Sequence, residues 1–518
     1  MATDWDAVII GGGHNGLVAA CYLAKAGLKV VVLERREVVG GASVTEETFP
    51  GFRISTAAMV GGLLKPKIAA DLELHKFGYG PLVSYDPVGL HLYPDNRYML
   101  WWNDPARTLE EFAKFSRRDG EAFLDLRMRM DRLAAVIKPL ELRSPMSVDE
   151  IAARFPHPED AHFFQEVLVS PMKDFLDARF ETEEVKVSIA PSGMVGLAGG
   201  PYSPGSVYMM LHYWPELGVP IGAVPGGMGA ITSALARCAR SHGAQVRTEV
   251  EVARVIVREE RASGVELVNG EKINARVVLS NADPKRSLLG LLEPDHLEES
   301  FRRRVASVRS EGVVFKINLA LSELPDFTAI PGKELGPQHI APFRICPSVD
   351  SLERAWDDAK FGRTSREPYM YCVIHSATDP TVVPEGKHSL GLFVQYAPYH
   401  LRGADWDTER DIFGKRCIDT LARYAPNIPD AIIDYQFLSP RDLEEKLYLT
   451  HGHMFHAENA LGQLFNARPM RGISDYRTPV PGYYLCGAGT HPGGTVRGAP
   501  GHNAAHEAIK DLREGVIG

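Results

Sequence analysis

Cysteine is scarce in this sequence, and its spacing excludes several classes of protein. The 518 residues include six cysteines, which lie far apart and form no C-x-x-C pair. A disulfide scaffold, a zinc knuckle and a dithiol redox pair are therefore not indicated. A chain with so few and such scattered thiols is more typical of a reducing compartment than of a secreted protein.

The chain also lacks an excess of basic residues, long apolar runs and a recognisable targeting segment. Its formal net charge is −9 at pH 7, which argues against a nucleic-acid-binding protein. It contains no run of eighteen apolar residues, so a membrane-spanning helix is not expected. The first residues have the pattern of neither a signal peptide nor a transit peptide. We therefore predict a soluble, cytoplasmic protein, while peripheral membrane contact and the oligomeric state stay open.

What the sequence does contain is a strand, a helix and a second strand close to its start. Residues 7–10 (AVII) and 30–33 (VVVL) are short, continuously apolar runs, as expected of buried parallel strands. Residues 17–26 between them are rich in alanine and leucine, and Gly27 suits a helix C-cap. This order predicts a βαβ unit of an α/β fold.

A glycine-rich turn joins the first predicted strand to the helix. Gly11, Gly13 and Gly16 satisfy the motif G-x-G-x-x-G. The first glycine of this motif permits a tight turn, the second lets the backbone approach a pyrophosphate, and the third lets the helix pack against the strand. The helix N-terminus then offers N–H groups and a partial positive charge to the phosphates. His14 lies within this turn, and we interpret it as a packing residue near the pyrophosphate.

Glu34 follows the second predicted strand, eighteen residues after Gly16. This is the position and the distance of a carboxylate that accepts hydrogen bonds from ribose hydroxyls. Because a strand precedes the motif and a helix follows it, the pattern predicts a dinucleotide site rather than an unrelated glycine turn. An acidic ribose residue suits FAD and NAD equally, so other features must decide between them.

Two further glycine-rich segments favour FAD. Gly40 and Gly41 come just after the second strand, where a second close approach of backbone to the cofactor needs such a doublet. A glycine-rich loop at 487–501 opens the last predicted helix and is placed to meet the flavin end of an extended FAD. Residues 227–229 (GMG) also precede a helix, but Thr232 stands where a third glycine is required. With one fingerprint, we predict no separate NAD(P)H domain.

The α/β segments come in three separated blocks with more irregular sequence between them. We predict that residues 1–60, 222–290 and 478–518 form an FAD-binding domain, and that residues 61–221 and 291–477 form a substrate domain over it. The composition, 45% hydrophobic and 24% charged, is that of an ordinary globular protein with enough apolar residues for such cores.

These segments in combination resemble the phytoene desaturase-like family of flavoproteins. The likeness is carried by residues 6–20, 33–36, 39–42, 225–229 (PGGMG), 280–284 (SNADP) and 487–494 (GAGTHPGG). Within that family, the sequence is most similar to the pyridine nucleotide-disulphide oxidoreductase domain-containing proteins of the second type, and it is also similar to the desaturase-type β-carotene ketolases. The resemblance spans nearly the whole chain. The disulfide in that name does not describe this chain, because the redox cysteines are absent.

The resemblance implies a glutathione-reductase-like FAD-binding Rossmann domain with an interrupted α+β substrate domain, as in amine oxidases. It implies that Glu34 binds the adenosine ribose, that backbone near Val252 meets the adenine, and that the helix after residues 497–501 points its N-terminus at the flavin. A positive helix end there would stabilise the reduced flavin. The full set of residues predicted to bind FAD is Gly11, Gly13, His14, Asn15, Gly16, Glu34, Arg35, Gly40, Gly41, Ala42, Val252, Gly487, Gly489, Val496, Gly498, Ala499 and Asn503.

A histidine-rich segment, residues 451–456 (HGHMFH), is the candidate for chemistry beside the flavin. Its H-x-H-x-x-H spacing is conceivable for a metal site, but no acidic residue at a clear spacing completes it, and we predict no metal. Related families carry a similar Gly-x-x-Phe-His segment at the flavin or substrate pocket, which makes His453 and His456 the candidate catalytic residues. A structural loop without a chemical role is the remaining interpretation.

We expect an FAD-dependent dehydrogenase or desaturase that transfers a hydride from a hydrophobic, polyene-like or lipid-like small molecule to flavin N5, with oxygen or a quinone as the final acceptor. The same architecture would serve a flavin amine oxidase, an isomerase or a ketolase. A non-catalytic lipid-binding module, resembling the Rab GDP-dissociation inhibitors that lack FAD, is the alternative outside enzymes. The intact glycine turn, Glu34 and the C-terminal glycine loop count against that alternative.

Replacing Glu34 with alanine tests the dinucleotide assignment. We expect the variant to bind FAD more weakly by about 1.5–3 kcal/mol, the contribution of a hydrogen bond to a charged group. Titration of the FAD-free protein with FAD, followed by flavin fluorescence, measures the change. A dissociation constant equal to that of the unaltered protein would refute the ribose-binding role.

Overall fold

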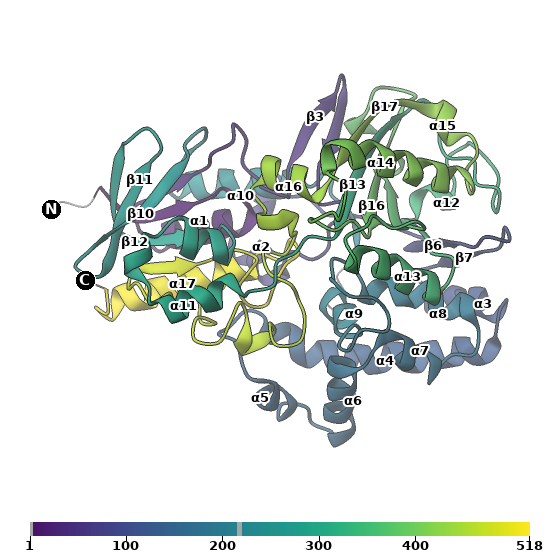
Figure 1. Ribbon diagram of the computed structural model, residues 1–518, viewed down its shortest axis with the longest axis horizontal. Helices are drawn as coiled ribbons and strands as arrows, with labels where there is room; N and C mark the ends of the chain where they lie inside the picture. The colour runs from purple at the N-terminus through teal and green to yellow at the C-terminus, as the bar shows by residue number, and fades with distance from the viewer. Residues whose placement is uncertain (1–3, 215–219, 518) are drawn as a thin grey trace.

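Two seven-stranded β-sheets, each with helices packed on it, make up most of the described protein (Figure 1). Two short strand pairs accompany them, β3 (Thr45–Phe49) with β4 (Phe52–Ser55) and β5 (Val83–Ser84) with β8 (Gly222–Ala223). The computed structural model describes residues 4–214 and 220–517. The first sheet and its helices lie on the left in Figure 1. The second sheet lies on the right, above a group of helices from the first half of the chain.

The first sheet is assembled from three separated parts of the chain. Its strand order is β10-β11-β12-β1-β2-β9, and β18 pairs with β12. β1 lies parallel to both β12 and β2, with Val8 opposite Val278 and Val31. The strands are β1 (Trp5–Ile10), β2 (Val30–Leu33), β9 (Gln245–Arg247), β10 (Val252–Arg258), β11 (Arg261–Leu267), β12 (Lys272–Ser280) and β18 (Tyr483–Leu485).

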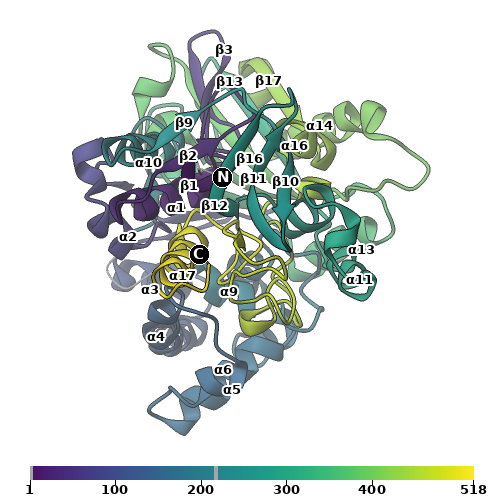
Figure 2. The same ribbon diagram turned by 90° about the vertical axis from the view of Figure 1, so that its left-hand side faces the viewer.

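Both faces of this sheet are covered, as expected of continuously apolar strands. Three helices pack on one face: α1 (His14–Lys25), α10 (Gly229–Ser241) and α17 (Ala499–Arg513). Figure 2 shows α17 beside α1, although the two are separated by most of the sequence. The other face packs with helix α11 (Glu299–Ala306). Apolar side chains of β10 and β11, which continue the sheet beyond β12, join the same core. The helix predicted at 17–26 is α1, and it begins three residues earlier than expected.

The second sheet has the strand order β17-β13-β16-β15-β14-β6-β7. Helix α14 (Trp406–Ala422) packs on one of its faces. The other face joins a large apolar core formed with α4 (Arg117–Leu140) and helices that follow it. The strands are β6 (Gly89–Leu92), β7 (Tyr98–Trp101), β13 (Val314–Leu321), β14 (Phe343–Ile345), β15 (Tyr369–Ile374), β16 (His388–Gln395) and β17 (Ile432–Leu438).

The other helices are mostly short. None of the helices in the described ranges 4–214 and 220–517 is long and apolar enough to cross a membrane. They are α2 (Pro66–Asp71), α3 (Pro105–Ala113), α5 (Val148–Ala152), α6 (Pro158–Val169), α7 (Met172–Asp177), α8 (Glu183–Ile189), α9 (Tyr208–Tyr213), α12 (Pro337–Ile340), α13 (Val349–Lys360), α15 (Ile428–Ala431) and α16 (Pro440–Leu447).

One segment of the first block packs on the second sheet rather than on the first. The hairpin of β3 (Thr45–Phe49) and β4 (Phe52–Ser55) projects beside β13 in Figure 1. Its apolar side chains Phe49, Phe52 and Ile54 pack with Ala320 of β13. The hairpin therefore links the two halves, and the domain boundaries within the chain stay a prediction.

A buried ionic cluster joins the end of α4 to the loop before α17. The Glu141 carboxylate accepts hydrogen bonds of 2.6 and 2.7 Å from Arg497, and it lies 2.6 Å from Lys65 Nζ and 3.4 Å from Lys138 Nζ. Burial by itself would raise the pKa of Glu141, but the charges of Arg497, Lys138 and Lys65 hold it well below its usual value. Because breaking a buried ion pair strands a charge, this cluster fixes the two segments together.

Gly16 allows a test of how closely α1 approaches the turn before it. A Cβ at Gly16 would lie 2.3 Å from the carbonyl oxygen of Gly11, which is backbone and cannot move aside. We expect Gly16→Ala to lower the free energy of unfolding by about 1–3 kcal/mol, the usual cost of overpacking. Chemical denaturation in excess FAD measures the loss.

Gly80→Ala is the matched control for this substitution. An added Cβ at exposed Gly80 would meet no atom of the described chain within 4 Å, so we expect a change of no more than about 0.5 kcal/mol. Equal stability of the two variants would contradict the close packing of α1 on the turn.

Candidate functional site

A large cavity with a volume of about 410 Å³ lies between the two halves of the protein. The first sheet contributes the glycine turn after β1 and the end of β2. The second sheet contributes residues of β13 and β16, and the segment from α16 to residue 456 closes the wall. The residues predicted from sequence that line the cavity are Gly11, Gly13, His14, Asn15, Glu34, Arg35, Gly40, Gly41, Ala42, Val252, His456 and Val496.

Glu34 is held in the cavity wall by the backbone on either side of it. Its Oε2 accepts a 2.8 Å hydrogen bond from the N–H of Gly12, and its Oε1 accepts a 2.9 Å bond from the N–H of Arg36. A carboxylate oxygen can accept more than one hydrogen bond, so both oxygens retain capacity for a ligand hydroxyl. The side chain is buried, which keeps its orientation fixed.

The N-terminus of α1 faces the cavity with the properties of an anion site. The first turn of the helix contains no acidic residue. His14 Nε2 and Asn15 Oδ1 are buried polar atoms without a hydrogen-bond partner among the described residues. Burial, together with the nearby His456, lowers the pKa of His14 to about 4, so its imidazole is neutral. Unpaired buried polar atoms are costly, and a bound ligand that pairs with them removes that cost.

Asn281 is a cavity residue that the motif analysis did not predict as part of the site. Its backbone N–H donates to the carbonyl of Ile10, and its side-chain amide donates a 3.4 Å bond to the carbonyl of Gly11. A Cβ at Gly13 would lie 2.7 Å from Asn281 Nδ2. A side chain at Gly13 would therefore displace the amide of Asn281 as well as a pyrophosphate. The SNADP segment at the end of β12 was the available signal for this residue.

Near Glu34, the cavity wall contains two arginines packed around an aromatic ring. The guanidinium of Arg35 lies 3.5 Å from the ring centroid of Tyr448, and that of Arg286 lies 4.0 Å from it. The Tyr448 hydroxyl donates a 2.7 Å hydrogen bond to Glu251, the neighbour of Val252. Arg35 was predicted from sequence, whereas Tyr448 and Arg286 were not, because they come from distant segments.

The predicted C-terminal residues divide into two groups. Val496 lines the cavity, whereas Gly487, Gly489, Gly498 and Ala499 are buried but do not form part of its wall. Their role in holding the cofactor stays a prediction.

Asn503 makes hydrogen bonds within the protein, and its predicted contact with the cofactor stays a prediction. Its amide donates hydrogen bonds to the carbonyls of Glu141 and Arg143, at 3.0 and 3.3 Å, and a 2.7 Å bond to the hydroxyl of Tyr476. These bonds anchor α17 to the segment after α4.

The three histidines of the segment 451–456 point to three different environments. His456 lines the cavity, and burial lowers its pKa. His453 is buried outside the cavity wall, where its Nδ1 accepts a 3.2 Å bond from the N–H of Phe455 and burial lowers its pKa to about 3. His451 turns toward Glu311 instead. The H-x-H-x-x-H spacing does not gather these residues into one centre, and only His456 of the two candidate catalytic histidines reaches the cavity.

Lys316 of β13 is the principal titratable group that sequence reasoning missed. It lines the cavity and is fully buried, and its Nζ donates a 3.0 Å bond to the carbonyl of Ile317 and a shorter one to Asn318 Oδ1. Burial lowers the pKa of this amine to about 7. The chain offers no sequence signal for it beyond a single lysine within an apolar strand.

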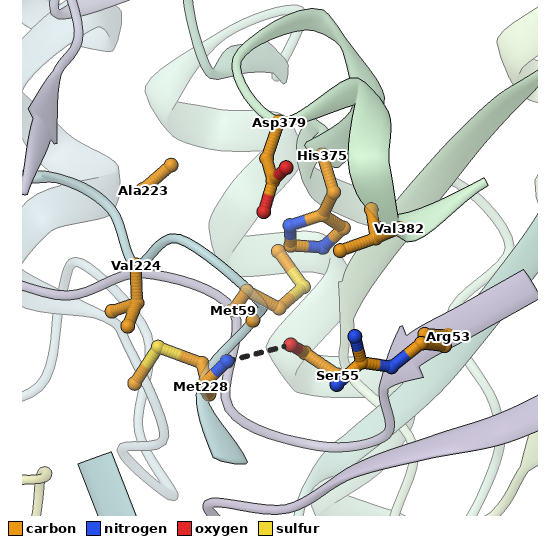
Figure 3. A pocket seen from close by; sticks show the side chains of 10 residues that line it. Arg53, Ser55, Met59, Ala223, Val224, Met228, His375, Asp379 and Val382 are labelled. Atoms are coloured by element: carbon orange, nitrogen blue, oxygen red, sulfur yellow. Dashed lines mark hydrogen bonds between the residues drawn. The ribbon is translucent and has the colours of Figure 1, made fainter. Parts of the chain in front are cut away.

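A second, much smaller pocket of about 20 Å³ lies beside His375 (Figure 3). His375 and Asp379 reach into it, opposite Met59 and Ser55. A Cβ at Gly391 would lie 2.9 Å from His375 Nε2 and 3.1 Å from Lys316 Nζ, so both nitrogens lie close to the backbone of Gly391. Burial and the charge of Lys316 lower the pKa of His375 to about 3.

Comparison with known proteins now decides the family. Residues 16–507 match the family described as flavin containing amine oxidoreductase, which accounts for nearly the whole chain. The chain belongs to this family.

Curated relatives of this flavin-containing amine oxidoreductase agree in length. The mouse (Mus musculus) pyridine nucleotide-disulfide oxidoreductase domain-containing protein 2 is 38% identical, over 99% of this chain and 94% of the relative. A limonene dehydrogenase subunit of Castellaniella defragrans is 27% identical, over 98% and 95% of the two chains. The neurosporene-forming phytoene desaturase of Cereibacter sphaeroides is 25% identical, over 96% and 93%. The resemblance to phytoene desaturase-like flavoproteins is confirmed.

Solved structures show the same fold. Putrescine oxidase bound to putrescine has a TM-score of 0.63 to this protein at 17% identity, with 98% of this chain and 99% of the other covered. This likeness confirms the predicted α/β fold class.

The protein is an FAD-dependent oxidoreductase. The cavity fits the cofactor of a flavin-containing amine oxidoreductase, because a helix N-terminus without acidic residues, a buried carboxylate and unpartnered polar atoms all meet at its wall. These are the groups that a diphosphate and a ribose require.

The pKa of Lys316 predicts a pH dependence of stability. Its folded pKa of about 7 lies below that of an exposed lysine, so between pH 7 and about 10.4 the unfolded chain binds a proton that the folded amine has released. Below pH 7 the unaltered protein buries a charged amine, so Lys316→Met should raise the free energy of unfolding most there. This gain should shrink by on the order of 4 kcal/mol as the pH rises through the window.

Denaturant unfolding at about pH 6 and about pH 10 measures this difference, and Lys415→Met, on the exposed face of α14, is the control. Lys415→Met should change the free energy of unfolding by the same amount at both pH values. If the effect of Lys316→Met on the free energy of unfolding were the same at both pH values, Lys316 would titrate like a solvated amine.

Proposed function

We propose that this protein is a dehydrogenase or desaturase that removes a hydride from a C–H bond of a hydrophobic, polyene-like or lipid-like substrate. The observation that supports this most is the apolar wall that the substrate half contributes to the cofactor cavity. That wall comprises Val314, Phe393, Leu443, Leu447, Leu449, Met454 and Phe455. A site built from such side chains favours a substrate that is itself apolar.

The charges of the cavity favour an apolar substrate over a cationic amine. Among the described residues that line it, the acidic ones are Glu34 and Glu251. Glu34 is bound to backbone beside the glycine turn, and Glu251 accepts a hydrogen bond from the Tyr448 hydroxyl. No carboxylate from the described part of the substrate half lines the cavity, and Lys316 would repel an ammonium group.

The assignment of cofactor contacts is part of this proposal. The N–H groups at the start of α1 bind the pyrophosphate, Glu34 binds the adenosine ribose, and residues 40–42 and Val252 line the adenosine half. FAD supplies the hydride acceptor when it is bound.

The protein's own groups then position the substrate, exclude water and handle protons. His456 is kept neutral by burial and can accept a hydrogen bond or a proton in the cavity. Lys316, whose pKa is about 7, can hold or release a proton at Nζ near neutral pH. Oxygen or a quinone as the final electron acceptor, and peripheral membrane contact, stay predictions.

The relatives' names are consistent with this substrate class. The limonene dehydrogenase subunit and the phytoene desaturases are named for limonene and phytoene, which are both hydrocarbons. The structural neighbour putrescine oxidase is named for an amine, but its 17% identity supports a shared fold alone.

Anaerobic reduction of the bound flavin tests the proposal. The holoprotein is mixed without oxygen with a panel of polyenes, unsaturated lipids and primary amines, and the loss of visible flavin absorbance is followed. We expect polyenes or lipids to bleach the flavin and amines to leave it oxidised. Bleaching by amines alone would overturn the hydrophobic-substrate assignment in favour of an amine oxidase.

Phe393→Ala sharpens the same experiment. Loss of this cavity side chain should lower kcat/KM for the active hydrophobic substrate roughly ten- to hundredfold, the equivalent of about 1.5–3 kcal/mol of lost apolar contact, with the FAD content unchanged. Phe361→Ala is the control, since Phe361 is 54% exposed at the end of α13, and it should leave kcat/KM unaltered. Equal kinetics of the two variants would place the substrate elsewhere.

A further inference from the structure

Three potential metal ligands from separate segments meet at one place outside the cofactor cavity. Glu311 precedes β13, His400 follows β16, and His451 lies in the 3-10 turn Thr450–Gly452. β13 and β16 are antiparallel neighbours with Val314 opposite Gln395, so the start of one strand lies beside the end of the other. The topology of the second sheet therefore brings Glu311 and His400 to the same edge.

Backbone hydrogen bonds place His451 at that edge too. The N–H of Gly312 donates a 3.0 Å bond to the carbonyl of His451, and the N–H of Tyr399 donates a 3.2 Å bond to the carbonyl of Gly312. The N–H of His451 donates a 3.0 Å bond to the carboxylate of Glu444. The backbone segments that carry the three ligands are thus joined by hydrogen bonds.

The donor atoms have the spacing of a metal site. His451 Nδ1 lies 3.0 Å from Glu311 Oε1, and His400 Nε2 lies 3.8 Å from Glu311 Oε2. One ligand atom from each of the three residues can be chosen so that all lie within 4.8 Å of one another. Ligands around a tetrahedral Zn²⁺ at the usual bond lengths are about 3.3 Å apart, so small side-chain adjustments would close this set on one ion.

An ion pair between His451 and Glu311 explains part of this geometry but not all of it. His451 Nδ1 is covered from solvent and makes no hydrogen bond of normal geometry with the described residues, despite the 3.0 Å approach of Glu311. The pair also does not account for His400, whose side chain is 73% exposed yet directs Nε2 toward the same carboxylate. Of the charged groups near His451, the Lys285 ammonium disfavours a cation there, whereas the Glu444 carboxylate favours one.

We propose that Glu311, His400 and His451 form a binding site for a divalent transition-metal ion of the zinc class. Two imidazoles and one carboxylate are a ligand set that such ions accept, with water completing the coordination from the exposed side. The sequence predicted no metal because the motif H-x-H-x-x-H lacked an acidic partner at a fixed spacing. The structure uses one histidine of that motif and takes the other two ligands from 51 and 140 residues upstream.

A metal at this site would brace one wall of the cofactor cavity. His451 is followed by Met454, Phe455 and His456, which line the cavity, while Glu311 precedes β13 and His400 follows β16 of the second sheet. An ion bound to all three would therefore tie the loop to the sheet and stabilise the folded protein, because a ligand that binds only the native state shifts unfolding. This inference does not depend on the identity of the substrate.

Zinc titration of the holoprotein tests the site. The protein, without a histidine tag, is dialysed against a chelator and then titrated with Zn²⁺ by calorimetry, and its melting temperature is measured with and without Zn²⁺. We expect about one ion per chain in the micromolar range or tighter, and a melting temperature that rises with Zn²⁺. His400→Ala and Glu311→Gln should each weaken binding at least tenfold and abolish the rise.

The exposed His162 of α6 supplies the control. His162→Ala removes a histidine of similar accessibility and should bind Zn²⁺ like the unaltered protein. His400 is largely exposed, so His400→Ala leaves the core intact, and unchanged visible flavin absorbance verifies that the variant is folded. Failure of the unaltered protein to bind Zn²⁺ in the micromolar range, or equal binding by His400→Ala, would overturn the proposal.

Discussion

Backbone segments that touch without intervening side chains hold the site together at the N-terminus of α1. A Cβ at Gly16 would meet the carbonyl of Gly11 at 2.3 Å, and one at Gly501 would meet the carbonyl of Asn15 at 2.0 Å. The first contact sets α1 on the turn after β1, and the second sets α17 against α1. Asn281, which follows the last residue of β12, completes the junction by bonding to Gly11. Gly16 and Gly501 are too close to these carbonyls to admit a larger residue, and the cavity lies beside the junction.

Burial rather than ion pairing governs the titratable groups of the cavity. His14, His456 and Lys316 all have lowered pKa values, and the main cause in each case is loss of solvation. Such an interior disfavours charged forms and suits an apolar substrate. A second group of buried charged residues lies around Glu141, where cations and a carboxylate offset one another at the junction of α4 with the C-terminal loop.

The segment 451–456 shows how one short motif can serve three purposes. His451 and His456 both have positive φ, at 52° and 60°, so the chain turns sharply on either side of His453. The turns send one histidine toward Glu311 at the surface, one into the core and one into the cavity. Regular spacing along the sequence therefore gives no proximity in space here, because the spacing rule presumes a regular helix or strand.

The sequence by itself determined the parts of the protein that lie within one local unit. β1, the turn with Gly11 and Gly13, α1, β2 and Glu34 span some thirty residues, and their hydrophobic pattern and glycine spacing leave few alternative structures. Only the tertiary structure decided that Lys316, Asn281 and Tyr448 share the cavity, that Asn503 is bonded inside the protein, and that His453 and His456 are separated. The reason is physical: a side chain's partners across a sheet or a domain junction depend on register and on backbone turns, and neither leaves a periodic signal along the chain.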